Sequence, residues 1–114
     1  MKRIIHVDNS EFFRKHMKTF LEKEGFEVES FDNTQDANLA IGIGLAEAII
    51  MGLTFSDGGG EEFLARILES FSGPVIVISS SADDDKKEKL LDLGAKMVFN
   101  KSESWKEKLK ACLS

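Results

Sequence analysis

The chain has 114 residues, of which 42% are hydrophobic and 31% are charged, and its net charge is −5 at pH 7. This composition is ordinary for a globular protein, and the length fits one domain over residues 1–114. Because nucleic acids and anionic membranes need a basic face, the negative charge argues against both as partners.

Three further features bear on the compartment. No apolar run approaches the roughly 20 residues that a membrane-spanning helix needs. The start, Met1-Lys2-Arg3-Ile4-Ile5, passes straight into a strand pattern without the features of a signal peptide. The one cysteine, Cys112, cannot form an internal disulfide. We therefore expect a reducing cytoplasmic location.

The first part of the chain alternates strand and helix patterns. A strand over residues 4–7 precedes a helix that Asn9 or Ser10 caps and Gly25 ends. The apolar face of this helix comprises Phe13, Met17, Phe20 and Leu21. Residues 26–31 alternate between two faces, which indicates a strand near a sheet edge. The next helix, capped by Asn33, is weak because it carries Gly42 and Gly44.

The apolar run over residues 49–55 predicts a fully buried central strand. A helix over residues 60–71 follows, and Asp57 is interpreted as an N-cap or turn residue before it. Gly58-Gly59-Gly60 lacks the lysine of a P-loop and the spacing of a dinucleotide fingerprint. We interpret it as a flexible turn.

The remaining patterns are a buried strand over residues 75–79, a charged helix over 83–93 ended by Gly94, a strand over 97–100, and a last helix. Ser104 and Glu107 predict a capping box for that helix. Its apolar stripe comprises Trp105, Leu109, Cys112 and Leu113. Five strand–helix units with two continuously apolar strands predict an α/β fold. Because crossovers are right-handed, the parallel sheet is doubly wound.

Four segments together resemble the receiver domains of two-component response regulators. They are Val7-Asp8-Asn9-Ser10, Leu53-Thr54-Phe55, Pro74 to Ser79, and Gly94 to Lys101. The resemblance spans nearly the whole chain and implies a flavodoxin-like fold with strand order 2-1-3-4-5. The family pocket holds paired acids after the first strand and a phospho-accepting aspartate after the third. It also holds a hydroxyl on the fourth strand and a lysine after the fifth.

Several positions match this pocket. Asp8 matches the first acid, Ser79 the hydroxyl and Lys101 the lysine. Thr54 matches a residue common two positions after the acceptor, and Gly60 matches the glycine that opens the third helix.

Other positions depart from the family pattern. Gly52 falls on the phospho-acceptor, and Asn9 replaces the second acid. Val98 stands where an aromatic switch residue is common, and Ser102 replaces the proline that usually follows the lysine.

These departures remove the chemistry that the resemblance would imply. An acyl phosphate needs a carboxylate nucleophile, which Gly52 lacks. Magnesium prefers several anionic oxygens, and only Asp8 remains, so we expect weak or absent magnesium binding, no other cofactor and no enzymatic activity. Lys101 is then predicted to pair with Asp8. The preferred interpretation is a receiver-like module that acts by phosphorylation-independent contact with a protein partner.

Two alternatives stay open. One is a phosphorelay receiver with a displaced acceptor, Asp8 or Asp57. The other is a small flavodoxin-like binder of an anion or nucleotide near Lys101 and Ser79, in a pocket enlarged by Gly52.

The resemblance also implies a partner surface on the helix over 83–93, the strand over 97–100 and the last helix. Its candidate residues are Lys86, Lys87, Val98 and Trp105. For Trp105 a place in the core or at its edge is the competing interpretation.

The two histidines carry no metal-site signal. His6 lies inside an apolar strand and is interpreted as a core histidine with its hydrogen bonds satisfied, rather than as a pH sensor. His16 is interpreted as a residue at the boundary of the core.

Overall fold

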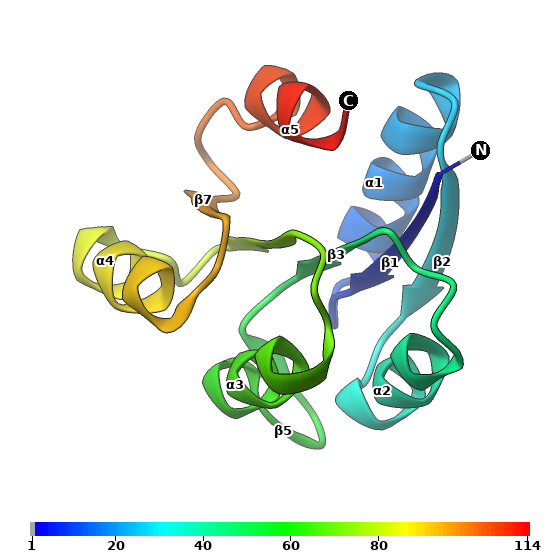
Figure 1. Ribbon diagram of the computed structural model, residues 1–114. Helices are drawn as coiled ribbons and strands as arrows, with labels where there is room; N and C mark the ends of the chain where they lie inside the picture. Colours follow the sequence, from blue (N-terminus) through cyan, green and yellow to red (C-terminus); the bar gives the residue numbers. More distant parts are fainter. Residues whose placement is uncertain (1) are drawn as a thin grey trace.

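A five-stranded parallel sheet forms the centre of the computed structural model, which describes residues 2–114 (Figure 1). The strands are β1 (Arg3–Val7), β2 (Glu27–Phe31), β3 (Ala48–Met51), β6 (Val75–Ser79) and β7 (Met97–Asn100). They lie in the order β2-β1-β3-β6-β7, and every neighbouring pair is parallel. This order confirms the predicted 2-1-3-4-5 arrangement, since β6 and β7 are the fourth and fifth strands of the sheet.

Five helices cover the two faces of the sheet. They are α1 (Glu11–Lys23), α2 (Thr34–Ile43), α3 (Gly60–Ser70), α4 (Asp84–Leu93) and α5 (Lys106–Leu113). Figure 1 shows α1 and α5 on one side and α2 and α3 on the other. The fold is therefore the doubly wound α/β fold expected from the sequence.

The strands divide their side chains between two hydrophobic cores. On β3, for example, Ile49 and Met51 face the helices α2, α3 and α4, whereas Ala48 and Ile50 face α1 and α5. Because both faces are covered, β3 and β6 are buried along their whole length. The edge strand β2 is mostly half-buried, as its alternating sequence predicted.

The third strand is shorter than predicted. The ladder bond from the Gly52 amide to the Val7 carbonyl is 2.9 Å long, and the pairing of β3 with β1 ends at this point. Thr54 and Phe55 form a separate strand, β4 (Thr54–Phe55), which pairs antiparallel with β5 (Gly58–Gly59). The predicted strand over residues 49–55 is therefore two elements, and the glycines are partly paired rather than a free turn.

Gly60 is required by a close approach of the chain to itself. A Cβ atom at this position would lie 2.5 Å from the Leu53 Cα atom, which no side chain tolerates. The Gly60 amide also donates to the Leu53 carbonyl at 3.0 Å. This contact folds the β4–β5 hairpin back against the end of β3.

The helix starts confirm two predicted caps and contradict a third. Ser10 accepts from the Phe13 amide at 3.1 Å, and Asn33 accepts from the Asp36 amide at 2.8 Å. The predicted capping box of Ser104 and Glu107 is wrong. Helix α5 begins at Lys106, and its N-cap residue Trp105 makes no side-chain cap bond.

The aromatic packing of Trp105 accounts for this late start. Its ring makes edge contacts with Phe13, His16 and Phe20 at centroid distances of 5.7 to 6.0 Å. The segment before it is held as a turn by Asn100, whose side-chain oxygen accepts from the Ser102 amide at 3.0 Å. No helix within residues 2–114 has both the length and the apolar character needed to cross a membrane.

Candidate functional site

The carboxyl ends of the central strands bring the predicted site residues to one edge of the sheet. Asp8 follows β1, Gly52 follows β3, Ser79 ends β6, and Lys101 follows β7. In open α/β sheets this edge is where ligands bind. Asp8, Gly52 and Ser79 are all buried there, so solvent does not reach the centre of this edge.

Asp8 and Lys101 form the ion pair that the sequence predicted. The Lys101 Nζ atom lies 3.2 Å from Oδ1 and 3.1 Å from Oδ2 of Asp8. The carboxylate is almost fully buried, whereas the Lys101 side chain keeps 23% of its surface exposed. Lys101 also lies over the Phe13 ring, 4.3 Å from its centroid. The lysine is thereby fixed between a carboxylate and an aromatic face.

The backbone around Asp8 is held by two further bonds. The Ser10 amide donates to Oδ1 at 2.8 Å, and the Arg14 guanidinium donates to the Asp8 carbonyl at 2.8 Å. The site therefore contains two cations and one carboxylate. In electrostatic terms it is poorer in negative charge than a pocket built for a divalent cation.

Gly52 leaves the position beside Asp8 without a side chain. A Cβ atom there would lie 3.0 Å from Asp8 Oδ2 and 3.5 Å from its Cγ, a tight contact. Oδ2 is buried and, among the described residues, has no partner with hydrogen-bond geometry, although Lys101 lies within ion-pair distance. The glycine thus allows the Asp8 carboxylate to occupy the space next to it.

The other predicted pocket residues do not converge on the Asp8–Lys101 pair. The Ser79 hydroxyl lies 3.0 Å from the Ser81 hydroxyl and accepts from the Ser81 amide at 3.2 Å. Thr54 is exposed on β4, where it pairs with Gly59, and Asn9 is also exposed. Within residues 2–114 neither Thr54 nor Asn9 has a side-chain hydrogen bond.

The residues at this edge do not fit a magnesium site. Asp8 is the single carboxylate present, and Lys101 already neutralises it. Over the described part of the chain, no three His, Cys, Asp or Glu side chains come together in a group that could hold a metal ion. Magnesium requires several hard anionic oxygens in near-octahedral positions, which this donor set does not supply.

Asp57 has a different role from the predicted N-cap or turn residue before α3. Its two carboxylate oxygens accept from the Thr34 and Gln35 amides, at 3.1 and 3.0 Å, so it caps the N-terminus of α2. The hydrogen bond from the Thr34 amide lowers the pKa of Asp57. The cap of α3 is Gly59, which offers no side chain.

His6 is buried but not satisfied, contrary to the prediction. Within residues 2–114 neither ring nitrogen has a hydrogen-bond partner. Burial, followed by the charges of Lys101 and Arg14, lowers the pKa of His6 to about 3. The ring packs edge-on against Phe13 at 5.7 Å, so His6 is a neutral part of the core. His16 is half-buried at the core boundary, as predicted.

The predicted partner surface is only partly exposed. Val98 and Trp105 are buried in the two cores. Lys86 pairs with Glu61, and Lys87 pairs with Glu103 at 2.6 Å. Of the four residues, only the lysines reach solvent, and both already have partners.

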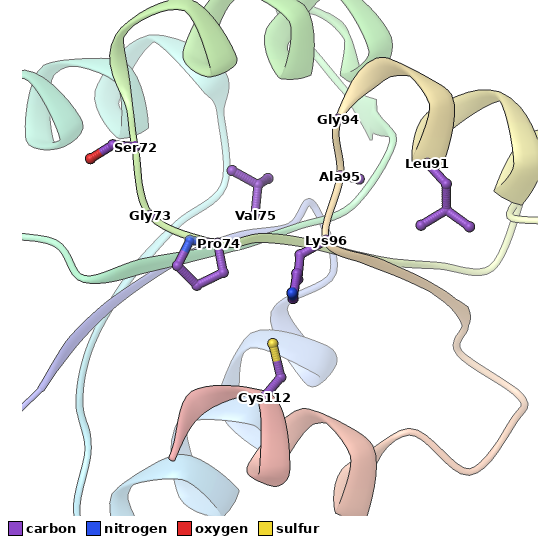
Figure 2. A pocket seen from close by; sticks show the side chains of 9 residues that line it. All are labelled: Ser72, Gly73, Pro74, Val75, Leu91, Gly94, Ala95, Lys96 and Cys112. Carbon is purple, nitrogen blue, oxygen red and sulfur yellow. The ribbon is translucent and has the colours of Figure 1, made fainter.

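A hollow of about 570 Å³ lies at the opposite end of the sheet, at the starts of β6 and β7 (Figure 2). Its lining includes Pro74, Leu91, Lys96 and Cys112. Among the residues that line it, Lys96 is the single charged one, so the hollow holds no cluster of charged groups. It is separate from the Asp8–Lys101 edge.

Comparisons with known proteins agree with this geometry. The family model for the response regulator receiver domain matches residues 4–113. The chain is 29% identical over 101 residues to the KDP operon transcriptional regulatory protein KdpE of Escherichia coli, an alignment that covers 89% of this chain and 45% of KdpE. The chain thus spans less than half the length of that relative.

Solved structures show the same fold. The beryllofluoride-activated receiver domain of Klebsiella pneumoniae RstA superposes with a TM-score of 0.90 at 16% identity, covering 98% of both chains. A two-component response regulator from Clostridium difficile superposes with a TM-score of 0.90 at 22% identity, covering 99% of this chain and 96% of the other. At these identities the likeness establishes the fold.

Proposed function

Because the chain belongs to the response regulator receiver domain family of two-component signalling, we propose that it is a receiver domain that acts without phosphorylation, through contact with a protein partner. The observation that carries the proposal is Gly52. It stands at the end of the central strand β3, next to Asp8. The resemblance to the family aligns this position with the phospho-acceptor. A glycine offers no nucleophile for an acyl phosphate.

The remaining pocket residues support the same proposal. Phosphoryl transfer depends on positioning and on charge neutralisation by a metal and a cation. Here Lys101 is paired with Asp8, and the donor set does not fit magnesium. The Ser79 hydroxyl is engaged with Ser81 instead of facing an open pocket.

A displaced acceptor has less support. Asp8 is buried and ion-paired, so attack on a phosphodonor would break its pair with Lys101. Both oxygens of Asp57 cap α2, so its phosphorylation would uncap that helix. The anion or nucleotide binder also has less support, since Asp8, Gly52 and Ser79 are buried beneath the edge.

Intact mass spectrometry after incubation with acetyl phosphate and magnesium tests the proposal. We expect no stoichiometric phosphoryl adduct on the wild-type chain, while a receiver with an intact acceptor aspartate becomes labelled in parallel. A matched double variant, Asn9→Asp with Gly52→Asp, restores both missing carboxylates and is expected to gain the adduct. A wild-type adduct would overturn the proposal, and its loss in Asp8→Asn or Asp57→Asn would identify the displaced acceptor.

A further inference from the structure

The end of α2 exposes three large apolar side chains. Leu39, Ile43 and Leu45 keep 68%, 71% and 59% of their surface exposed. They belong to a run without any charged residue, from Asn38 to Ala46, in a chain that is 31% charged. We call Leu39, Ile43 and Leu45 the α2 patch. Clustered exposed apolar groups mark interaction sites more often than single ones do.

Packing within the chain does not explain the α2 patch. The core-facing side of α2 is formed by Ala37 and Ile41, whereas Leu39 and Ile43 lie outside the core and are exposed. Figure 1 shows α2 beneath β1 and β2, on the outside of the molecule. The patch therefore has no partner among the described residues.

Gly42 adds a second observation to the patch. A Cβ atom at Gly42 would meet no atom within 4 Å, and its φ angle is not in the left-handed region, so the fold does not require glycine there. Glycine inside a helix is less favourable than alanine by about 1 kcal/mol. Because Gly42 has no side chain, another chain could approach the helix backbone closely between Leu39 and Ile43.

The charges around the patch define the kind of partner. Asp36 lies one turn before Leu39 on the same helix face. Arg3 and Glu29 line a small hollow of about 90 Å³ together with Ile43 and Leu45, and the two charges lie 3.8 Å apart. Arg3 also lies 4.0 Å from Glu27, so acids outnumber the one base around the patch.

We propose that the α2 patch binds an amphipathic helix of a partner protein, whose apolar stripe is flanked by lysine or arginine. The inference rests on the proposed function, because it names the surface through which a receiver without phosphorylation would act. A second copy of this chain fits less well. A two-fold contact through the patch would place the same acidic rim against itself.

A titration followed by NMR tests the proposal. The probe is a synthetic leucine–lysine peptide with leucines at helical spacing, added to the isotope-labelled full chain. We expect amide shift changes concentrated on residues 34–47. A scrambled peptide of the same composition and a leucine–glutamate peptide of the same pattern should bind about tenfold or more weakly, because they lack the stripe or the complementary charge.

Two double variants provide the matched comparison. Leu39→Ser with Ile43→Ser should weaken binding about tenfold or more, since it removes the apolar surface that the peptide covers. Leu91→Ser with Leu93→Ser alters exposed leucines on α4, at 46% and 45% exposure, and should leave binding unchanged. All four side chains are exposed, so both variants are expected to fold.

Three outcomes would overturn the proposal: shift changes centred outside residues 34–47, equal binding of the glutamate peptide, or no binding at millimolar concentration. A fourth outcome comes from sedimentation of the free protein. If the wild-type chain self-associates and the variant Leu39→Ser with Ile43→Ser does not, the patch binds a second copy of this chain and the proposal is overturned. Because no phosphodonor is present, these results are independent of the adduct measurement. Failure of one proposal is therefore distinguishable from failure of the other.

Discussion

At the scale of single residues, the missing side chain at Gly52 changes the role of its neighbours. Lys101 would face several anions in a family pocket, but here its carboxylate partner is Asp8 alone. The Asp8 Oδ2 atom lies beside Gly52. A Cβ atom added at position 52 would lie only 3.0 Å from this oxygen. Under the proposed function, the pair is a structural contact in the place where family members carry out phosphoryl transfer.

His6 predicts an acid-sensitive contribution to stability. Its pKa of about 3 in the folded chain lies below the ordinary value of 6.5, because burial and the charges of Lys101 and Arg14 disfavour the protonated ring. The unfolded chain therefore binds more protons between these two values. The contribution is complete above pH 6.5 and is lost as the pH falls toward 3, by about 1.4 kcal/mol for each pH unit.

Urea unfolding of wild type and His6→Leu over this pH range measures the effect. The variant should lose stability less steeply on acidification, because leucine has no proton to bind. The carboxylates titrate in both proteins, so they cancel in the difference. Parallel curves for the two proteins would contradict the prediction.

The sequence was sufficient for some residue contacts and not for others. The Asp8–Lys101 pair followed from the family resemblance, although the two residues are 93 positions apart. The role of Asp57 was missed because its partners, Thr34 and Gln35, lie 23 and 22 positions earlier and only tertiary packing brings them together. For His6, burial was predictable from its strand, but its lack of hydrogen-bond partners depends on the packing around it.

At the scale of elements, α4 is held to its neighbours by charges. Lys86 and Lys89 both pair with Glu61 at the start of α3, and Lys87 pairs with Glu103 before α5. Only Leu90 of α4 is fully buried. Ion pairs therefore contribute to orienting this helix, together with the packing of Leu90.

Replacing Glu61 by Gln should loosen α4 selectively. The variant loses both lysine contacts, and amide hydrogen exchange in residues 84–93 should accelerate while exchange in α1 stays unchanged. The loss of global stability should be small, about 0–1 kcal/mol, because the pairs are solvent-accessible. Glu62→Gln is the matched control, since Glu62 is exposed and has no ion pair in the described chain. Equal acceleration in both variants would contradict this role of Glu61.

The alternation of strands and helices was predictable because each apolar run and each helix face repeats over many residues. The boundaries of these strands and helices were less predictable. The end of β3 at Met51 depends on where its pairing with β1 stops, and the start of α5 depends on the packing of Trp105 against α1. Both are contacts between elements far apart in the chain, which a local sequence pattern does not contain.

At the scale of the whole molecule, we predict one conformation. In the family, the phosphoryl group acts through the hydroxyl on the fourth strand and an aromatic residue on the fifth. Here Ser79 is engaged with Ser81, and Val98 is a buried aliphatic residue. A switch between two states needs a ligand that binds one state more tightly than the other. Under the proposed function, Gly52 offers no acceptor for the phosphoryl group that plays this role in the family.

Beryllofluoride, a mimic of the phosphoryl group, provides the measurement. Addition of this reagent with magnesium should leave the amide NMR spectrum of the wild-type chain unchanged. A receiver with an intact acceptor aspartate serves as the positive control. Large shift changes across β6, α4 and β7 of this chain would mean that a second state exists and is reachable.

The contact between Asp8 and Lys101 has a consequence for the order of folding. It joins the first strand to the residue after the last strand, and Lys2 likewise donates to the Leu113 carbonyl at 2.8 Å. Neither contact can form until β7 and α5 have docked, because closing so long a loop is entropically costly until the intervening strands are in place. We therefore expect the ion pair to form in the last stage of assembly and to slow unfolding more than it speeds refolding. Two residues that match the family pocket would then stabilise the finished sheet by joining the end of its first strand to the end of its last strand.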